Sequence, residues 1–217
     1  MRIPDLSARC GAPPSMFVEL LLLLLALAIA LLMRPWRLMP RGERTGPMMA
    51  MLVLLPFLWT LPVPLPLAGQ VRWSGACLVL LMLGWPVAVP VLIGAAAIAW
   101  GISDTLDVPQ AVDLALWSGV LPATLGVLLG AVVRRYAGYH VFVYVLVRAF
   151  LGTVVCLFAS SLLHRWLQPP YGADLPWVAH WLMAWGDGII TGMLASIFVA
   201  YAPGWLATWS DRRFLYK

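Results

Sequence analysis

The chain has 217 residues, of which 63% are hydrophobic and only 11% charged. Soluble domains carry about 25% charged residues, so this chain has too few polar side chains to cover a water-soluble fold of its length. The net charge of +5 comes from basic residues that cluster between apolar runs, which is how membrane topology signals are distributed. The composition therefore indicates an integral membrane protein that contacts the lipid bilayer, and it gives no reason to expect nucleic-acid binding.

Six apolar runs follow one another along the chain, at 17–33, 49–67, 75–101, 114–133, 141–163 and 177–201. A helix of about twenty apolar residues crosses the ~30 Å hydrocarbon core of a bilayer. The connections are short and rich in Pro, Gly and charge, as in "RPWRLMPRGERTGP" and "RWLQPPYGADLP". We predict a transmembrane domain over 16–206 and a cytoplasmic basic and aromatic tail over 207–217.

The N-terminus resembles a signal peptide, because Arg2 and Arg9 precede the run "FVELLLLLLALAIALLM". However, "MRPWR" follows that run where a small-residue cleavage site would stand. We therefore expect an uncleaved first span preceded by a flexible tail over residues 1–15. Met1 and Met16 both remain open as the start of the protein.

The third run, 75–101, decides how many times the chain crosses the membrane. Leaving out Arg148, which lies inside a run, one crossing per run would divide the other thirteen Lys and Arg residues eight to five between the two sides, whereas a hairpin at "GWPVAVP" divides them nine to four. The nine inner residues are Arg34, Arg37, Arg41, Arg44, Arg134, Arg135, Arg212, Arg213 and Lys217, and the four outer ones are Arg2, Arg9, Arg72 and Arg165. The second division obeys the positive-inside rule far better.

We therefore predict an all-α, polytopic transmembrane bundle of about seven helical segments, with 75–101 as a broken hairpin. The N-terminus is expected outside and the C-terminus inside. Each hairpin arm would have about thirteen residues, or ~20 Å, which is too short to cross a bilayer alone. Such arms need to be shielded by neighbouring helices, or to have polar ends that line a cavity.

Three strings in the region 75–215 carry a family resemblance: "LLMLGWPVAV", "YHVFVYVLVRAFLG" and "GDGIITGMLASIFVAYAPGWLATWSDRRF". Together they resemble a group of proteobacterial membrane proteins of the energy-coupling-factor (ECF) transporter class. These are distant relatives of the cobalt and nickel capture subunits of the CbiM and NikM type. The resemblance implies a seven-helix permease or capture subunit in the bacterial inner membrane, with a coupling permease and ATPase subunits as separate partner chains.

The metal site of those relatives is altered in this sequence. In the relatives, the N-terminal amine, a histidine at the second position and histidines before the third helix bind the ion. Arg2 and Arg72 stand at the corresponding places here, and an arginine cannot lose its proton to bind a metal. We expect no tight cobalt or nickel binding at that site and no resident cofactor. A non-transporting membrane scaffold or assembly partner that kept the fold is the alternative function.

Two ionisable residues lie deep in the predicted spans. Counted from the nearest span ends, Arg148 lies about 10 Å deep and Asp187 about 15 Å deep, so two antiparallel helices would bring them to similar height. We interpret them as an intramembrane ion pair. Two other interpretations stay open: a substrate or proton pathway residue, or a protonated Asp187 hydrogen-bonded to backbone.

The remaining candidates concern packing and metal binding. Gly126 with Gly130, and Gly188 with Gly192, repeat the GxxxG spacing that lets helix backbones approach closely, either within the bundle or at a homodimer face. His164 and His180 flank one outer loop and are candidates for an external metal site. The sequence contains no nucleophile–base constellation, P-loop or HExxH motif, so we expect no enzyme activity from this chain.

Overall fold

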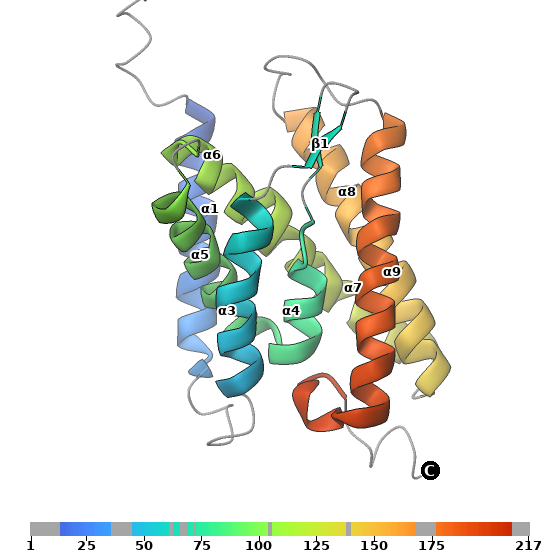
Figure 1. Ribbon diagram of the computed structural model, residues 1–217. Coiled ribbons are helices and arrows are strands. Elements are labelled where there is room, and N and C mark those ends of the chain that lie inside the picture. Colours follow the sequence, from blue (N-terminus) through green and yellow to red (C-terminus); the bar gives the residue numbers. More distant parts are fainter. Residues whose placement is uncertain are drawn as a thin grey trace, which may run out of the picture.

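The computed structural model describes residues 14–35, 45–60, 63–65, 69–71, 73–103, 106–137, 140–167 and 177–209. Over these residues the chain makes seven helical passes that run alternately in opposite directions (Figure 1). The first five passes and their parts are α1 (Pro14–Leu32), α3 (Thr45–Thr60), α4 (Ala76–Leu83), α5 (Trp85–Ile102), and the composite of α6 (Val108–Asp113), η2 (Leu114–Val120) and α7 (Leu121–Ala137). The last two are η3 (Val143–Leu151) with α8 (Gly152–Leu167), and α9 (Trp177–Tyr201), which the short η4 (Pro203–Trp205) follows. The predicted helical bundle is confirmed.

The bundle has an upper and a lower end in the view of Figure 1. The upper end carries the start of α1, α6 and the start of α9, and the lower end carries the end of α9 and η4. Among the described residues, four helices are long and apolar enough to cross a membrane: Trp85–Ile102, Val108–Tyr136, Val143–Leu167 and Trp177–Tyr201. The shorter α1 and α3 are apolar too, and both expose large aliphatic and aromatic side chains. Such surface suits lipid better than water.

The third pass is broken where the sequence predicts it. Gly84 separates α4 from α5 with φ 76° and ψ 158°, a conformation open mainly to glycine, and Pro86 follows in the first turn of α5. The arms are not about thirteen residues each, as expected, but eight and eighteen. α5 can therefore cross alone, while α4 extends only about 12 Å.

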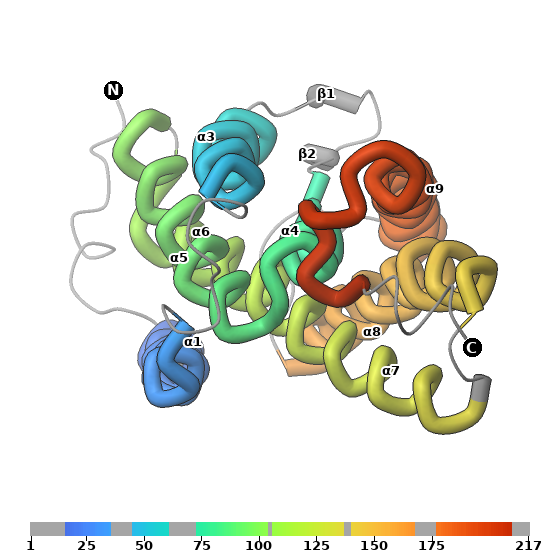
Figure 2. The backbone as a smooth tube through the Cα atoms, turned by 90° about the horizontal axis from the view of Figure 1, so that it is seen from below, coloured from blue at the N-terminus to red at the C-terminus, as the bar shows by residue number. Residues whose placement is uncertain are grey.

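The short α4 is shielded, as such an arm requires. All eight of its residues are buried, and α3, α5, α7 and α9 contact it. Figure 2 shows α4 in the middle of the bundle with the chain after α9 folded beneath it. There Ala207 and Thr208 donate backbone hydrogen bonds to the carbonyls of Met82 and Leu81, at 3.0 and 3.3 Å. These bonds satisfy carbonyls at the end of α4 that lack helical partners.

The segment after α9 is thus part of the packed bundle as far as it is described. Trp209 is buried, and the hydroxyl of Thr208 lies 2.8 Å from that of Tyr144. The first three residues of the predicted tail, 207–209, therefore pack against the helices, and 210–217 lie outside the described residues.

A short β-hairpin is the exception to the all-helical prediction. β1 (Val63–Leu65) pairs antiparallel with β2 (Gly69–Val71) at the upper end of the bundle. The sequence analysis placed residues 63–67 in an apolar run, but α3 ends at Thr60. Prolines at 62, 64 and 66 explain the ending, because each lacks the backbone N–H that a helix needs.

Two passes contain π-helical stretches, η2 and η3. π-Helical turns are rare and often mark functional sites. Here η2 carries Trp117 and Ser118, and η3 carries Arg148. Both π-helical stretches therefore carry polar side chains inside the membrane-spanning part of the bundle.

Candidate functional site

Asp187 is held at the N-terminus of the broken helix α4. Its side chain is 5% exposed, and Oδ2 accepts a hydrogen bond of 3.1 Å from the backbone N–H of Ser74. Ser74 directly precedes Gly75, the N-cap residue of α4. The first N–H groups of a helix lack helical partners and carry partial positive charge. A carboxylate in the apolar interior of the bundle is therefore stabilised by the open end of a helix.

The turn that begins α4 is fixed from several sides. Gly75 has φ +63°, and a Cβ there would lie 2.8 Å from Leu55 Cδ1. The indole N–H of Trp59 donates to the Ser74 carbonyl at 3.2 Å. The Ser74 hydroxyl donates to the carbonyl of Ser118 on η2. Helices α3, η2 and α9 thus hold the amide that faces Asp187.

A polar cavity of about 60 Å³ lies beside this turn. Its polar lining residues are Ser74, Ser118, Ser161, His180 and Asp187. Within the described part of the chain, Asp187 Oδ1 has no hydrogen-bond partner. A space of this size holds a few water molecules, and the buried Asp187 side chain is part of its wall.

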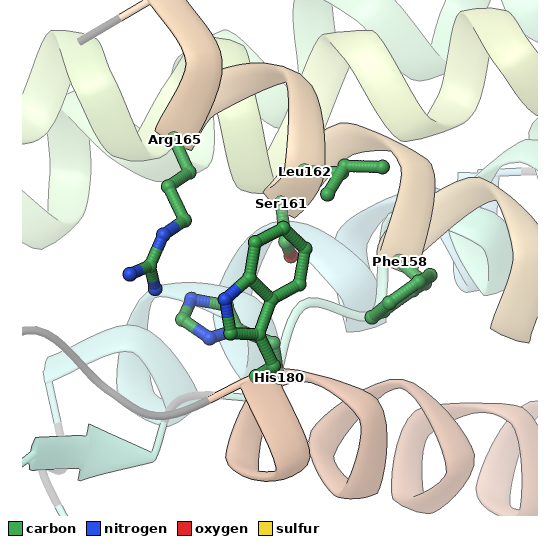
Figure 3. A pocket seen from close by; sticks show the side chains of 6 residues that line it. Phe158, Ser161, Leu162, Arg165 and His180 are labelled. Atoms are coloured by element: carbon green, nitrogen blue, oxygen red, sulfur yellow. The ribbon is translucent and has the colours of Figure 1, made fainter.

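A smaller pocket of about 10 Å³ shares Ser161 and His180 with the cavity. Figure 3 shows Arg165 from α8 and His180 from α9 reaching toward one another between the two helices. The Arg165 guanidinium lies over the Trp177 ring, 5.0 Å from its centroid. Arg165 is in the last turn of α8, at the upper end of the bundle. Ser161 and His180 line both pockets and therefore connect this end with the cavity at Asp187.

The predicted ion pair between Arg148 and Asp187 is wrong. Arg148 is 9% exposed, lies 5.6 Å from the centroid of the Tyr144 ring, and has no hydrogen-bond partner at Nε or Nη1 among the residues that the structure describes. Gly188, next to Asp187, packs against Val154, six residues beyond Arg148 and so about 9 Å along the helix. The two side chains also face different neighbours, since Arg148 packs on Gly130 of α7.

The four glycines expected to pack helices lie at contacts between helices of this chain. A Cβ on Gly126 would lie 2.7 Å from Leu80, and one on Gly130 would lie 2.9 Å from Arg148 Nε. On α9, a Cβ would lie 2.5 Å from Val154 at Gly188 and 3.1 Å from Phe150 Cβ at Gly192. The two glycine pairs therefore let α7 approach α4 and η3, and let α9 approach α8 and η3.

The histidines expected to flank a metal site have separate neighbours. His164 Nε2 lies 3.0 Å from Asp113 Oδ1, and its ring is 4.9 Å from that of Trp117, whereas His180 lines the pockets with Ser161. No group of three or more His, Cys, Asp or Glu side chains able to hold a metal occurs among the described residues. Arg2 and Arg72 lie outside the described residues.

Glu19 is a buried acid that the sequence analysis missed. It is 5% exposed, and its Oε1 accepts a 2.9 Å hydrogen bond from the Trp117 indole. The signal was present as a lone acid in the leucine-rich run "FVELLLLLL". Glu19 and His164 both contact Trp117, and Trp117 also lines the Asp187 cavity. The η2 segment therefore lies between two polar clusters.

The arrangement at Asp187 can bind a small positively charged species or exchange a proton. Asp187 supplies a carboxyl group, one oxygen of which has no hydrogen-bond partner among the described residues, and the serine hydroxyls and His180 supply further polar atoms around the cavity. No known protein family, curated protein or solved structure matches this chain.

Proposed function

We propose that this chain is an integral membrane permease or capture subunit and that the cavity at Asp187 is its solute site. The observation that carries the proposal is a buried carboxyl group at the N-terminus of an interrupted helix, on a residue that lines a polar cavity. Membrane transporters commonly bind solutes where a helix is broken near the middle of the bilayer, because exposed backbone groups there are available to ligands.

The proposed solute is a small cation, with the proton as its smallest member. The cavity of about 60 Å³ admits species no larger than a few waters. Its one described ionisable oxygen without a partner belongs to Asp187, which favours a positive occupant. His180 and Ser161 line the approach from the upper end.

The family resemblance supports a permease or capture role in the bacterial inner membrane, with a coupling permease and ATPase subunits as separate chains. Cobalt or nickel uptake through the relatives' own site is not part of the proposal, because Arg2 and Arg72 stand at two of its ligand positions. That same substitution favours the alternative, a non-transporting membrane scaffold. The two functions differ in whether Asp187 is needed for solute movement.

The test combines binding and uptake with the purified protein. The Tm of the protein in detergent is measured over a range of pH and with added monovalent and divalent cations. Each cation that changes the Tm is then tested for uptake into proteoliposomes. We expect at least one cation to change the Tm and to be taken up, and we expect Asp187→Asn to lose both responses, because the amide cannot carry the negative charge of a carboxylate. Asp107→Asn is the matched control, since Asp107 is an exposed acid at the start of α6, and it should retain both responses.

Two outcomes would count against the proposal. Uptake that persists in Asp187→Asn would remove the cavity from the transport path. A wild-type protein that shows neither a Tm response nor uptake with any cation tested would favour the scaffold.

A further inference from the structure

Three ionisable side chains that do not line the Asp187 cavity gather around Trp117 near the upper end of the bundle. Glu19 comes from α1, Asp113 ends α6, and His164 lies in the last turn of α8. Glu19 Oε1 accepts the 2.9 Å hydrogen bond from the Trp117 indole, and the His164 and Trp117 ring centroids are 4.9 Å apart. His164 Nε2 lies 3.0 Å from Asp113 Oδ1. Glu19, Asp113 and His164 are called the Trp117 cluster below.

The charge of the Trp117 cluster depends on His164. The helices packed together here, α1, α5, α6 and η2, contain no lysine or arginine, and α8 supplies His164 and Arg165. The Arg165 guanidinium lies over a tryptophan ring of α9, where His180 lines the solute cavity. The base placed against Glu19 and Asp113 is therefore His164, and histidine is the side chain whose charge ordinarily changes between pH 5 and 8.

The pair of His164 and Asp113 is open to protons, whereas Glu19 is not. The His164 and Asp113 side chains are 36% and 41% exposed, while Glu19 is 5% exposed. Asp113 Oδ1 accepts no hydrogen bond from the described residues, although His164 Nε2 is 3.0 Å away. The contact is thus one of charge, and it is favourable only while His164 carries a proton.

The Trp117 cluster is connected to Asp187 through η2. Trp117 lines the cavity at Asp187. The carbonyl of the next residue, Ser118, accepts the Ser74 hydroxyl, and the Ser74 N–H donates to Asp187 Oδ2. A ring contact, a peptide bond and two hydrogen bonds therefore link His164 to Asp187. Contiguous contacts of this kind can carry energetic coupling between two sites.

We propose that the Trp117 cluster is a second, proton-binding site and that its protonation weakens cation binding in the Asp187 cavity. The second half rests on the proposed function of that cavity, whereas the first half does not. A proton on His164 adds a positive charge near the cavity wall, and like charges repel. It also draws His164 toward Asp113 and so changes the packing of Trp117, which is part of that wall.

A double-mutant cycle tests the proton site in the absence of any added solute. The Tm of the full chain in detergent is measured for wild type, His164→Gln, Asp113→Asn and the double variant at about pH 5.5 and about pH 8, on either side of the range in which histidine ordinarily titrates. At the lower pH each single variant should lower the Tm by about 2 °C, and the double variant should lose no more than either. At the higher pH the imidazole is neutral, so this shared loss should disappear. His140→Gln, an exposed histidine just before η3, is the matched control and should behave like wild type.

The connection to Asp187 is tested with a cation that changes the wild-type Tm. The concentration that gives half of the response should rise from the higher to the lower pH, and the rise should be about fivefold smaller in His164→Gln than in wild type or His140→Gln. Asp187 and His180 are present in all three proteins, so the difference belongs to the Trp117 cluster. Glu19→Gln keeps an acceptor for the Trp117 indole but not the charge, and it should also show a smaller rise. It keeps the test valid if His164→Gln fails to fold.

Each contrary outcome removes a stated part of the proposal. The absence of a shared Tm loss at the lower pH would overturn the proton site. A shared loss, together with the same pH dependence of the cation response in every variant, would overturn its control of Asp187. A wild type that responds to no cation would count against the function proposed for the cavity and against that control, while the double-mutant cycle would still decide the proton site.

Discussion

At the scale of single residues, the sequence identifies the unusual side chains better than their partners. Asp187 and Arg148 stand out because each interrupts an apolar run, and both are buried as expected. Asp187, however, bonds a backbone N–H 113 residues away in sequence. A search for opposite charges cannot find such a partner, because every residue except proline carries a backbone N–H.

The absence of an ion pair changes the expected result of a double mutant. Asp187→Ala should lower the free energy of unfolding by about 1–3 kcal/mol, because it leaves the buried Ser74 N–H without an acceptor. Residues that are not in contact and share no partner give additive effects within about 0.5 kcal/mol. We therefore expect Asp187→Ala and Arg148→Gln to add in unfolding measurements in detergent. A double variant that is markedly more stable than the sum of the two single effects predicts would instead be evidence for an ion pair in the wild-type protein.

At the scale of elements, local chemistry predicts where the third pass breaks but not where its first arm begins. Gly84 and Pro86 stop and restart a helix through their own backbone preferences. The start of α4 depends instead on Gly75, whose positive φ is combined with contacts from Trp59, Ser118 and Asp187 around it. Those contacts come from distant helices, so the eight-residue length of α4 is not readable from the run itself.

The contact between α9 and α8 gives a matched pair of glycine substitutions. A Cβ on Gly188 would lie 2.5 Å from Val154 Cγ2 and 3.2 Å from the Phe150 carbonyl, whereas one on Gly186 meets nothing within 4 Å. We expect Gly188→Ala to destabilise by about 1–3 kcal/mol through overpacking. Gly186→Ala should be neutral or stabilising by up to about 1 kcal/mol, because alanine favours helix. Thermal unfolding in detergent measures both; equal effects would contradict the close packing.

At the scale of the whole molecule, the seven passes place the first and last helices in the same direction, so the two ends of the described chain lie at opposite ends of the bundle (Figure 1). The described charges are unevenly divided. Arg34 follows α1, and Arg134 with Arg135 ends α7, all at the lower end. At the upper end, Asp107 precedes α6 and Asp113 ends it, and Arg165 in the last turn of α8 is the cation there among the described residues. Charge counting therefore gave the correct number of passes, because the helical break and the basic clusters are both encoded locally. The polar clusters around η2 could not be predicted from charge counting, because they join side chains from helices that are distant in sequence.

The same division predicts how the bundle lies in a membrane. Basic residues remain on the cytoplasmic side, so the lower end should face the cytoplasm and the upper end the outside. With Cys10 replaced by serine, Cys77 and Cys156 are buried and should not react. A membrane-impermeant maleimide should then label Asp107→Cys in intact cells, and Arg134→Cys only after permeabilisation. The reverse pattern would invert the orientation. Labelling of both sites from the same side would contradict the seven passes, because α6 to α7 would then fail to cross.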